Sequence, residues 1–347
     1  MNKRPGWVFY TSLILLTAFV GLGAVNPEQL SAWAGIGLKF TTEHFGWLYL
    51  FATSGFLLFC ISIAISDYGH IRLGADGEAA EFPYLTWLGM IFSAGMGVGL
   101  VFWAVAEPMS HFVSPPFGEA EPRSPQAAGA AMRYALFHLA VVSTVFGVAT
   151  TLGLGVIQIN SGLVSVSDVP FGASQQLMIL AGISMIFLVC ALAPLESGVR
   201  YISDLNMLLA GALLVFVFFA GPTDFITAAM TNAIGDYFGN IMGMSLVMTP
   251  YTGDDWVERW TIFYWAWGLS WAPFVGSFIA RISRGRTIRE FVMGVIGMPV
   301  LLSVLWFSTF GGSALYFELF EGAALGDAVV QEMSSALFAT LALLPGA

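Results

Sequence analysis

The chain has 347 residues, of which 57% are hydrophobic and only 10% are charged. Soluble domains carry about 25% charged residues, so this composition excludes an ordinary soluble domain. Repeated apolar runs, each about 20 residues long and able to cross a bilayer, predict an all-α, polytopic membrane protein. We attribute the net charge of −10 to carboxylates in the loops.

Eight apolar segments follow one another along the chain, near residues 7–24, 47–66, 85–106, 134–158, 176–194, 205–221, 260–280 and 291–311. The first lacks the small-residue cleavage pattern of a signal peptide and is predicted to be a retained helix. Residues 230–250 are apolar but contain Asn232, Asp236 and Asn240, a pattern that favours a helix lying along the membrane interface.

Basic residues test this count of segments, because short loops rich in Lys and Arg stay on the cytoplasmic side. Lys3 and Arg4 place the N-terminus in the cytoplasm, and Arg72 agrees. Eight crossings would nevertheless put Arg200 and the later arginines outside. These later arginines, the arginine cluster, are Arg281, Arg284, Arg286 and Arg289. A membrane crossing is therefore missing between Arg72 and Arg200, or a re-entrant segment restores the count. The candidate place is segment 134–158, where the hydrophobic periodicity changes near His138 and Leu139.

The segment WTIFYWAWGLSWAPFVGSFIARISRGRTIRE is unusually aromatic for a membrane span. Its rings are Trp260, Phe263, Tyr264, Trp265, Trp267, Trp271 and Phe274. Tryptophan normally lies at the lipid–water interface, whereas electron-rich ring faces inside a protein suit a permanent cation. The segment therefore predicts a quaternary ammonium ligand.

A second candidate segment, SAGMGVGLVFWAVAEP, carries glycines at positions 95, 97 and 99. Clustered glycine favours local unwinding, which frees carbonyl groups to coordinate a cation near the midplane. Close packing of two helices through the GxxxG spacing is an equal alternative. Phe102 and Trp103 extend the aromatic pattern to this helix and favour a functional role, while Glu107 is expected at the membrane surface.

The segments GMGVGLVFWAVAEP, TVFGVATTLGLGVIQINSGL and IFYWAWGLSWAPFVGSFIARISRGRTIREF, with the loop DYGHIRLGADGEAAEF, resemble the betaine/choline/carnitine transporter family. This resemblance implies twelve spans, with two lead helices before two inverted five-helix repeats. It divides the single transporter domain 1–347 into lead helices (1–66), a first-repeat remnant (84–221) and part of the second repeat (230–347).

The same resemblance implies departures from the family pattern. The stretch ALFH, which opens the family's fourth span, is followed here by residues similar to the fifth span. The fourth span is therefore expected to be missing. The last three spans are likewise expected to be absent after Pro345-Gly346-Ala347, and Gly268 stands where familiar members carry a second adjacent Trp.

Site residues are carried over from the resemblance position by position. The substrate path is expected to include Trp267 and Trp271, with Phe274 near the cytoplasmic gate, and Phe102, Trp103, Gly97 and Gly99 from the glycine-rich helix. Trp265 lies only two residues from Trp267, so its spacing predicts that it faces another direction, and a packing role is an equal alternative for it.

The resemblance also implies sodium as the coupling ion and no other cofactor. One sodium site would use the carbonyl groups of Ser93 and Met96, because sodium is a hard cation that favours oxygen. Thr150 and Thr151 offer hydroxyls for a second cation, or they bond only to their own helix. Gly99 matches the sodium-coupled pattern, since proton-coupled choline transporters of the family carry an acidic residue there.

The sequence thus predicts a sodium-coupled symporter, not an enzyme, in the bacterial inner membrane. Its expected partners are an osmolyte (glycine betaine, choline, carnitine or a sulfonium analogue), the lipid bilayer and two further copies in a homotrimer, without nucleic acid. The alternative is a transport-inactive, shortened family member. The four histidines are far apart in sequence, and their spacing predicts no metal site.

Overall fold

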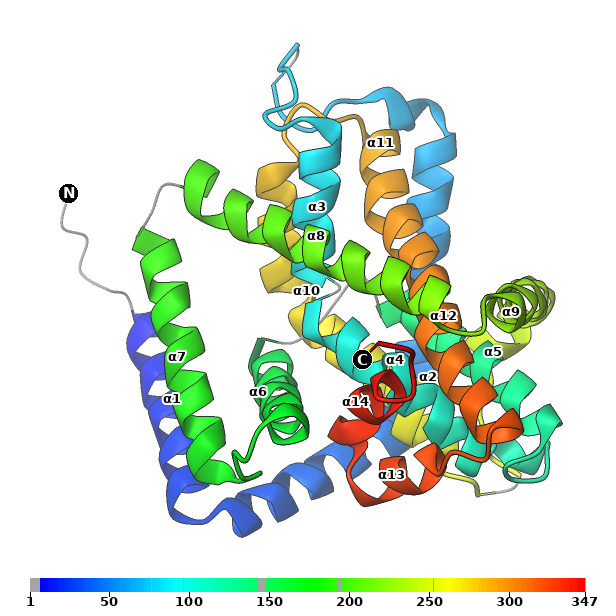
Figure 1. Ribbon diagram of the computed structural model, residues 1–347. Coiled ribbons are helices and arrows are strands. Elements are labelled where there is room, and N and C mark those ends of the chain that lie inside the picture. Colours follow the sequence, from blue (N-terminus) through cyan, green and yellow to red (C-terminus); the bar gives the residue numbers. More distant parts are fainter. Residues whose placement is uncertain are drawn as a thin grey trace.

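A computed structural model describes residues 7–75, 77–95, 97–142, 148–192, 195–251 and 253–346. Within these ranges the regular structure is helical, and the chain pairs in β fashion only at the isolated bridge between Arg72 and Thr287. The predicted all-α class is therefore confirmed, and long apolar helices fit a polytopic membrane protein (Figure 1).

The N-terminal part consists of two helices and a short turn: α1 (Trp7–Val25), α2 (Pro27–Ile65) and η1 (Asp67–His70). Asn26 separates the two helices, and its side-chain oxygen accepts a hydrogen bond from the Gln29 amide at 3.1 Å, while Pro27 fits the first helical position. The second helix begins twenty residues before the predicted apolar segment 47–66.

The next part contains α3 (Tyr84–Gly95), α4 (Gly97–Val113), η2 (Pro116–Gly118), α5 (Pro125–Val142) and α6 (Val148–Val166). The predicted single segment 134–158 is wrong, because it holds the end of α5 and the start of α6, with residues 143–147 outside the described ranges. The change of pattern near His138 thus lies close to a boundary between two helices.

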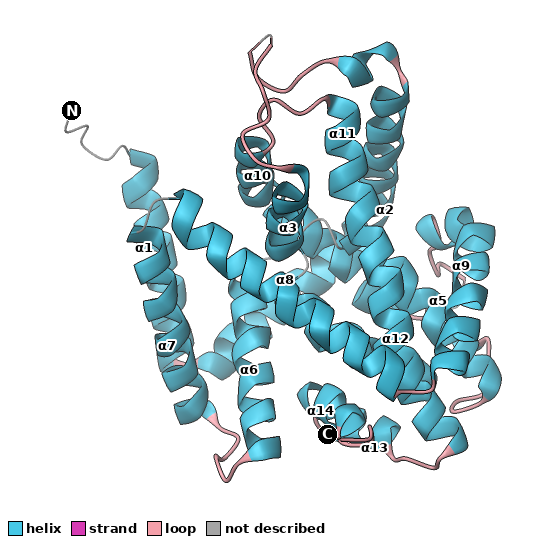
Figure 2. Ribbon diagram, turned by 45° about the horizontal axis from the view of Figure 1, so that its top comes forward, coloured by secondary structure: helices cyan, strands magenta, loops and turns pink. Residues whose placement is uncertain are grey.

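The following helices are α7 (Ala173–Leu192), α8 (Leu195–Ala220) and α9 (Thr223–Ser245). Figures 1 and 2 both show α7 beside α1 at one edge of the molecule, while α8 runs from this edge toward α12. Residues 230–250 fall mainly in α9, which packs on α5 and α12; its position at the membrane interface stays a prediction.

The C-terminal part begins with the π-helical turn η3 (Glu258–Ile262), followed directly by α10 (Phe263–Ile282). It continues through α11 (Ile288–Val292), the π-helical turn η4 (Met293–Gly297), α12 (Met298–Phe320), α13 (Leu325–Gln331), η5 (Met333–Ser335) and α14 (Ala336–Leu341).

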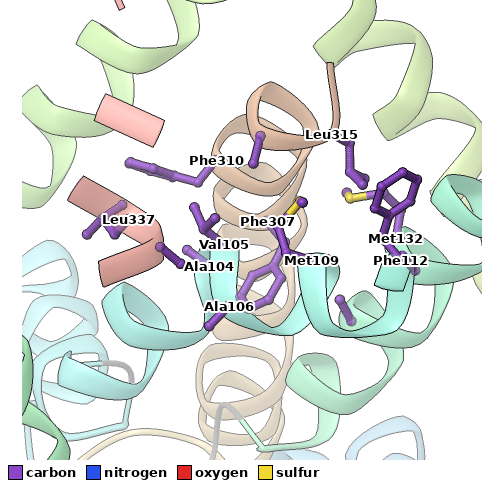
Figure 3. Close-up of a cluster of buried hydrophobic side chains, with 14 of the residues drawn as sticks. Ala104, Val105, Ala106, Met109, Phe112, Met132, Phe307, Phe310, Leu315 and Leu337 are labelled. Atoms are coloured by element: carbon purple, nitrogen blue, oxygen red, sulfur yellow. The ribbon is translucent and has the colours of Figure 1, made fainter. Parts of the chain in front are cut away.

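The largest apolar core lies where α12 packs against α4 and α5. Figure 3 shows side chains of these helices and of α14 meeting there, among them Val105, Met109, Met132, Phe307 and Leu337. The Trp306 indole donates a hydrogen bond to the Leu100 carbonyl at 3.1 Å, so a polar contact also ties α12 to α4. This core fixes the position of α4, which carries several candidate site residues.

Three described helical stretches are long and apolar enough to cross a membrane by length and composition: Pro27–Ile65, Ile202–Ala220 and Ile288–Phe320. Large apolar side chains on α2, such as Phe51, Phe56 and Phe59, are exposed, as expected of a surface that faces lipid chains. The count of eight spanning segments and the division into repeats stay predictions.

The arginine cluster anchors the loop after α2 to the loop between α10 and α11. Arg281 forms a bidentate pair with Glu81, Arg286 donates to the Phe82 carbonyl at 2.7 Å, and Arg289 donates to the Ala64 carbonyl at 2.8 Å. The guanidinium of Arg286 also lies 4.9 Å from the ring centre of Trp87. Three of these arginines therefore join α10, α11 and the loop between them to α2 and to the loop after it. This role is separate from the predicted effect of their charge on membrane orientation.

Candidate substrate site

Five aromatic side chains from α4, η3 and α10 form one group of two buried and three half-buried rings, which we call the aromatic cluster. Its members are Trp103, Trp260, Phe263, Tyr264 and Trp267. The Trp103 ring meets the rings of Trp260 and Tyr264 edge to face, each with centroids 5.8 Å apart. The Tyr264 and Trp267 rings are nearly parallel at 6.2 Å. The structure thus brings the predicted residues Trp103 and Trp267 into one cluster, through Tyr264.

The helical register explains this convergence. Positions 260, 264 and 267 recur at intervals of four and three residues, so their side chains share one face. The π-helical turn η3 meets α10 within this stretch, and such turns recur at functional sites because they reorient neighbouring side chains.

Trp265 belongs to a different group of residues. Its ring packs in a second apolar core with Leu50 of α2 and with Tyr134 and Phe137 of α5. The expectation that Trp265 and Trp267 face different directions is therefore confirmed. Trp265 joins α10 to the rest of the fold, whereas Trp267 belongs to the aromatic cluster.

Phe102 contacts the aromatic cluster only from its rim. Its ring centre lies 4.9 Å from that of Trp103, but the side chain is buried in the large core around α12. Its predicted contact with substrate stays a prediction, and the structure gives Phe102 a packing role behind Trp103.

Several predicted site residues lie outside what the structure describes. Met96 lies outside the described ranges. At the other predicted positions the structure describes the helix but not the surroundings of the residue; these positions are Ser93, Gly97, Gly99, Thr150, Thr151, Trp271 and Phe274. Their proposed roles in binding substrate and sodium rest on the sequence.

A buried polar network lies next to the aromatic cluster and was not predicted. The Glu107 carboxylate accepts a hydrogen bond from the Tyr264 hydroxyl at 3.0 Å, and its other oxygen lies 2.7 Å from Nδ1 of His138. Nε2 of His138 lies 3.0 Å from the Thr261 hydroxyl. Glu107 therefore connects α4, α5 and α10, and it fixes the tilt of a ring that stacks on Trp267.

Two sequence predictions are corrected by this network. Glu107, expected at the membrane surface, is fully buried, because it lies in the middle of α4, which packs against α5 and α12 and which Tyr264 of α10 reaches. His111 and His138, expected to be unrelated, lie with Glu107 in a single group of possible metal ligands. The available signal was the i, i+4 spacing of Glu107 and His111 within an apolar helix, where an ionisable residue indicates a functional site.

A cavity of about 530 Å³ opens beside the aromatic cluster. Phe263 lines it together with Asp254 and Asp255, which precede η3, and with Glu258, the first residue of η3. Because the Phe263 ring also lies 5.8 Å from that of Trp267, the cavity reaches the edge of the aromatic cluster. Carboxylates and ring faces both attract cations, but Lys39 and Arg259 also line the cavity, and Arg259 pairs with Asp255 at 2.7 Å.

The fold and this site define an all-α membrane protein with an inward-facing aromatic cluster on two helices. The model of the betaine/carnitine/choline family of transporters matches residues 7–141 and 138–347. The chain therefore belongs to this family, whose members are transporters and not enzymes.

Three relatives illustrate the range of the family. The chain is 42% identical to an ectoine/hydroxyectoine transporter of Virgibacillus pantothenticus over 99% of this chain and 79% of the relative. It is 40% identical to the glycine betaine transporter OpuD of Bacillus subtilis (strain 168), over 91% of this chain and 72% of OpuD. It is 34% identical to the high-affinity choline transport protein of Escherichia coli (strain K12), over 97% and 57% respectively.

The match to the family model is divided into two blocks. The two matched blocks meet at residues 138–141, inside the segment where the charges indicated a missing crossing. The alignment to the Virgibacillus protein covers 397 residues, more than the 347 of this chain, so that relative carries residues inside the alignment that are absent here.

Proposed function

We propose that this protein is a sodium-coupled symporter of betaine-like compatible solutes. The observation that carries the proposal is the aromatic cluster: Trp103 and Trp267 come from two segments that the sequence linked to an onium ligand, and they meet through Tyr264. Ring faces attract quaternary ammonium groups by about 0.5–2 kcal/mol each, depending on desolvation. The three relatives transport ectoine, glycine betaine and choline by name, and this supports the same solute class.

Ectoine is a second candidate substrate, favoured by the 42% identity to the Virgibacillus transporter. Ectoine and glycine betaine both combine a delocalised or quaternary cation with a carboxylate, so one aromatic cluster suits both. Competition between the two solutes for uptake measures the preference.

The coupling ion and the setting of the protein are part of the proposal. Ser93 and Met96 would bind sodium through backbone carbonyls, with Thr150 and Thr151 as candidates for a second ion.

The charge pattern supports a cytoplasmic N-terminus in a bacterial inner membrane, and the family resemblance supports a homotrimer. Labelling of an Arg284→Cys variant from either face of the membrane tests the orientation.

A transport-inactive protein is the alternative, favoured by the junction at 138–141. We infer that the family's fourth span is the segment missing there. Without it, one inverted repeat lacks a helix that alternating access would require.

Uptake of radiolabelled glycine betaine and of ectoine, into cells without their own osmolyte transporters, tests the proposal. We expect uptake that depends on a sodium gradient. Trp267→Ala should raise KM about tenfold, equivalent to about 1.4 kcal/mol, whereas Trp267→Phe, which keeps a ring face, should remain close to the unaltered protein. Trp47→Ala, at an exposed position on α2, is the control for loss of a tryptophan.

Absence of uptake by protein that is present in the membrane would favour the inactive alternative. Equal uptake with and without the sodium gradient would reject sodium coupling but not the transport of the solute. Equal KM values for Trp267→Ala and the unaltered protein would reject the role of the aromatic cluster.

A further inference from the structure

Three buried side chains next to the aromatic cluster converge on one point. Glu107 and His111 lie one helical turn apart on α4, and His138 reaches them from α5. Oε1 of Glu107 lies 2.7 Å from Nδ1 of His138 and 3.5 Å from Nε2 of His111. One ligand atom from each of the three residues lies within 4.8 Å of the other two.

His111 is the member of this group that the protein leaves unsatisfied. Its side chain is buried, and neither ring nitrogen makes a hydrogen bond with any residue in the described ranges. Indole rings enclose it, with the Trp260 ring centre at 4.5 Å and that of Trp256 at 5.3 Å. The nearest carboxylate oxygen, on Glu107, lies 3.5 Å from Nε2 without forming a hydrogen bond, and a buried imidazole left without one is costly, so its presence requires an explanation. A bound ion at Nε2 would supply the missing partner.

We propose that Glu107, His111 and His138 bind a divalent transition-metal ion of the Zn²⁺ type between α4 and α5. Two imidazoles and one carboxylate are a ligand set that zinc and its neighbours prefer, whereas Mg²⁺, Ca²⁺ and Na⁺ prefer oxygen alone. The site is distinct from the sodium sites proposed above, and Glu107 contacts the aromatic cluster through Tyr264.

Two of the three separations between ligand atoms lie within about 0.6 Å of the zinc geometry, and the third, between the two imidazoles, lies within 4.8 Å. Bonds of about 2.0–2.1 Å in a tetrahedron place ligand atoms roughly 3.3 Å apart. The separation of 3.5 Å between Glu107 and His111 matches this value. The shorter contact between Glu107 and His138 is a hydrogen bond, and it has to lengthen by about 0.6 Å when a metal replaces the shared proton.

Neighbouring groups suit the ligand roles of His138 and Glu107. With Nδ1 of His138 on the metal, the proton resides on Nε2, which lies 3.0 Å from the Thr261 hydroxyl and can donate to it. The Tyr264 hydroxyl donates to the second oxygen of Glu107 and leaves the first available for the metal. Such outer hydrogen bonds orient metal ligands in proteins.

Metal binding by the purified full chain tests the site. The protein would be prepared in detergent with an affinity tag free of histidine, treated with a chelator, and dialysed against Zn²⁺ in the presence of excess Mg²⁺. Elemental analysis then gives the zinc content. We compare the unaltered protein with His111→Ala/His138→Ala and with His44→Ala/His70→Ala. Each double variant removes two of the four histidines, and the control pair is exposed.

We expect one zinc ion per chain in the unaltered protein and in the control variant, and none above background in His111→Ala/His138→Ala. Glu107→Gln should weaken binding at least about tenfold. Equal zinc in all proteins, or none in the unaltered protein, would overturn the proposal. If the His111→Ala/His138→Ala variant does not fold, Co²⁺ bound to the unaltered protein decides: visible bands of tetrahedral Co²⁺ support the site, and their absence overturns it.

Discussion

Nε of Arg289 donates a hydrogen bond to the backbone carbonyl of Ala64 at 2.8 Å, across 225 positions of sequence. Ala64 lies in the last turn of α2, where carbonyl groups lack partners within the helix. Arg289 lies in α11 and also reaches the Ser66 carbonyl at 3.5 Å. Arg289, whose charge predicts the side of the membrane, thus also caps the C-terminal end of α2.

Arg289→Ala should therefore destabilise the protein. The carbonyl of Ala64 loses its charged donor, and the positive charge near the C-terminal end of α2 is removed. We expect a loss of about 1–2 kcal/mol, measured as a lower Tm of the purified protein. Arg284→Ala is the matched control, because Arg284 belongs to the same cluster but is exposed. Equal Tm values for the two variants would contradict the capping role.

The ion pair between Glu81 and Arg281 should make this junction sensitive to acid. The hydrogen bond from the Arg281 guanidinium lowers the pKa of Glu81 below its ordinary value, so the unfolded chain binds a proton more readily than the folded one. The pair then stabilises the fold above the ordinary pKa of glutamate, and this stabilisation is lost as the pH falls through the lowered value. The effect is small because both side chains are accessible to solvent.

Thermal unfolding of Glu81→Gln between neutral and acidic pH measures this contribution. We expect the Tm of the variant to lie slightly below that of the unaltered protein at neutral pH and the two to converge in acid. Glu321→Gln, at an exposed position, should run parallel to the unaltered protein over the whole range. A constant difference for Glu81→Gln would disprove the linkage.

Replacement of Glu107 by glutamine should weaken the contact between α4, α5 and α10. The amide oxygen can still accept from the Tyr264 hydroxyl, but the NH₂ group then has to donate to Nδ1 of His138, so the charge-assisted contacts are lost and the imidazole has to carry its proton on Nε2. We expect a loss of about 1–3 kcal/mol, seen as a lower Tm in detergent. An unchanged Tm would mean that the buried carboxylate is dispensable for stability.

Gly285 is required by a close approach of two loops. Its φ is +77°, and a Cβ there would lie 2.3 Å from the Ala79 carbonyl oxygen, which belongs to the backbone and cannot move aside easily. Gly285→Ala should cost about 1–3 kcal/mol. Gly129→Ala, within α5 and with open space around its Cβ position, should be neutral or stabilising by up to about 1 kcal/mol. A smaller loss of Tm for Gly285→Ala than for Gly129→Ala would refute the constraint.

Much of the class, and the two aromatic segments that form the cluster, could be predicted from the sequence. Composition and run length predict a helical membrane protein, since a bilayer demands apolar segments with internally bonded backbones. Spacing along one helix is also readable, so the divergence of Trp265 from Trp267 was predictable. The basic residues indicated that a crossing is missing, and the family match is divided in the same segment.

The polar network depended on tertiary structure. Sequence spacing relates Glu107 to His111 because both lie on one helix, but it gives no relation to His138 on α5 or to Tyr264 on α10. Those residues meet because α12 packs against α4 and α5 and holds the middle of α4 in the interior. Contacts between helices depend on how their side chains interlock over the whole core. For that reason the aromatic residues could be recognised in the sequence, whereas the buried carboxylate and its two histidines became a site only in the folded chain.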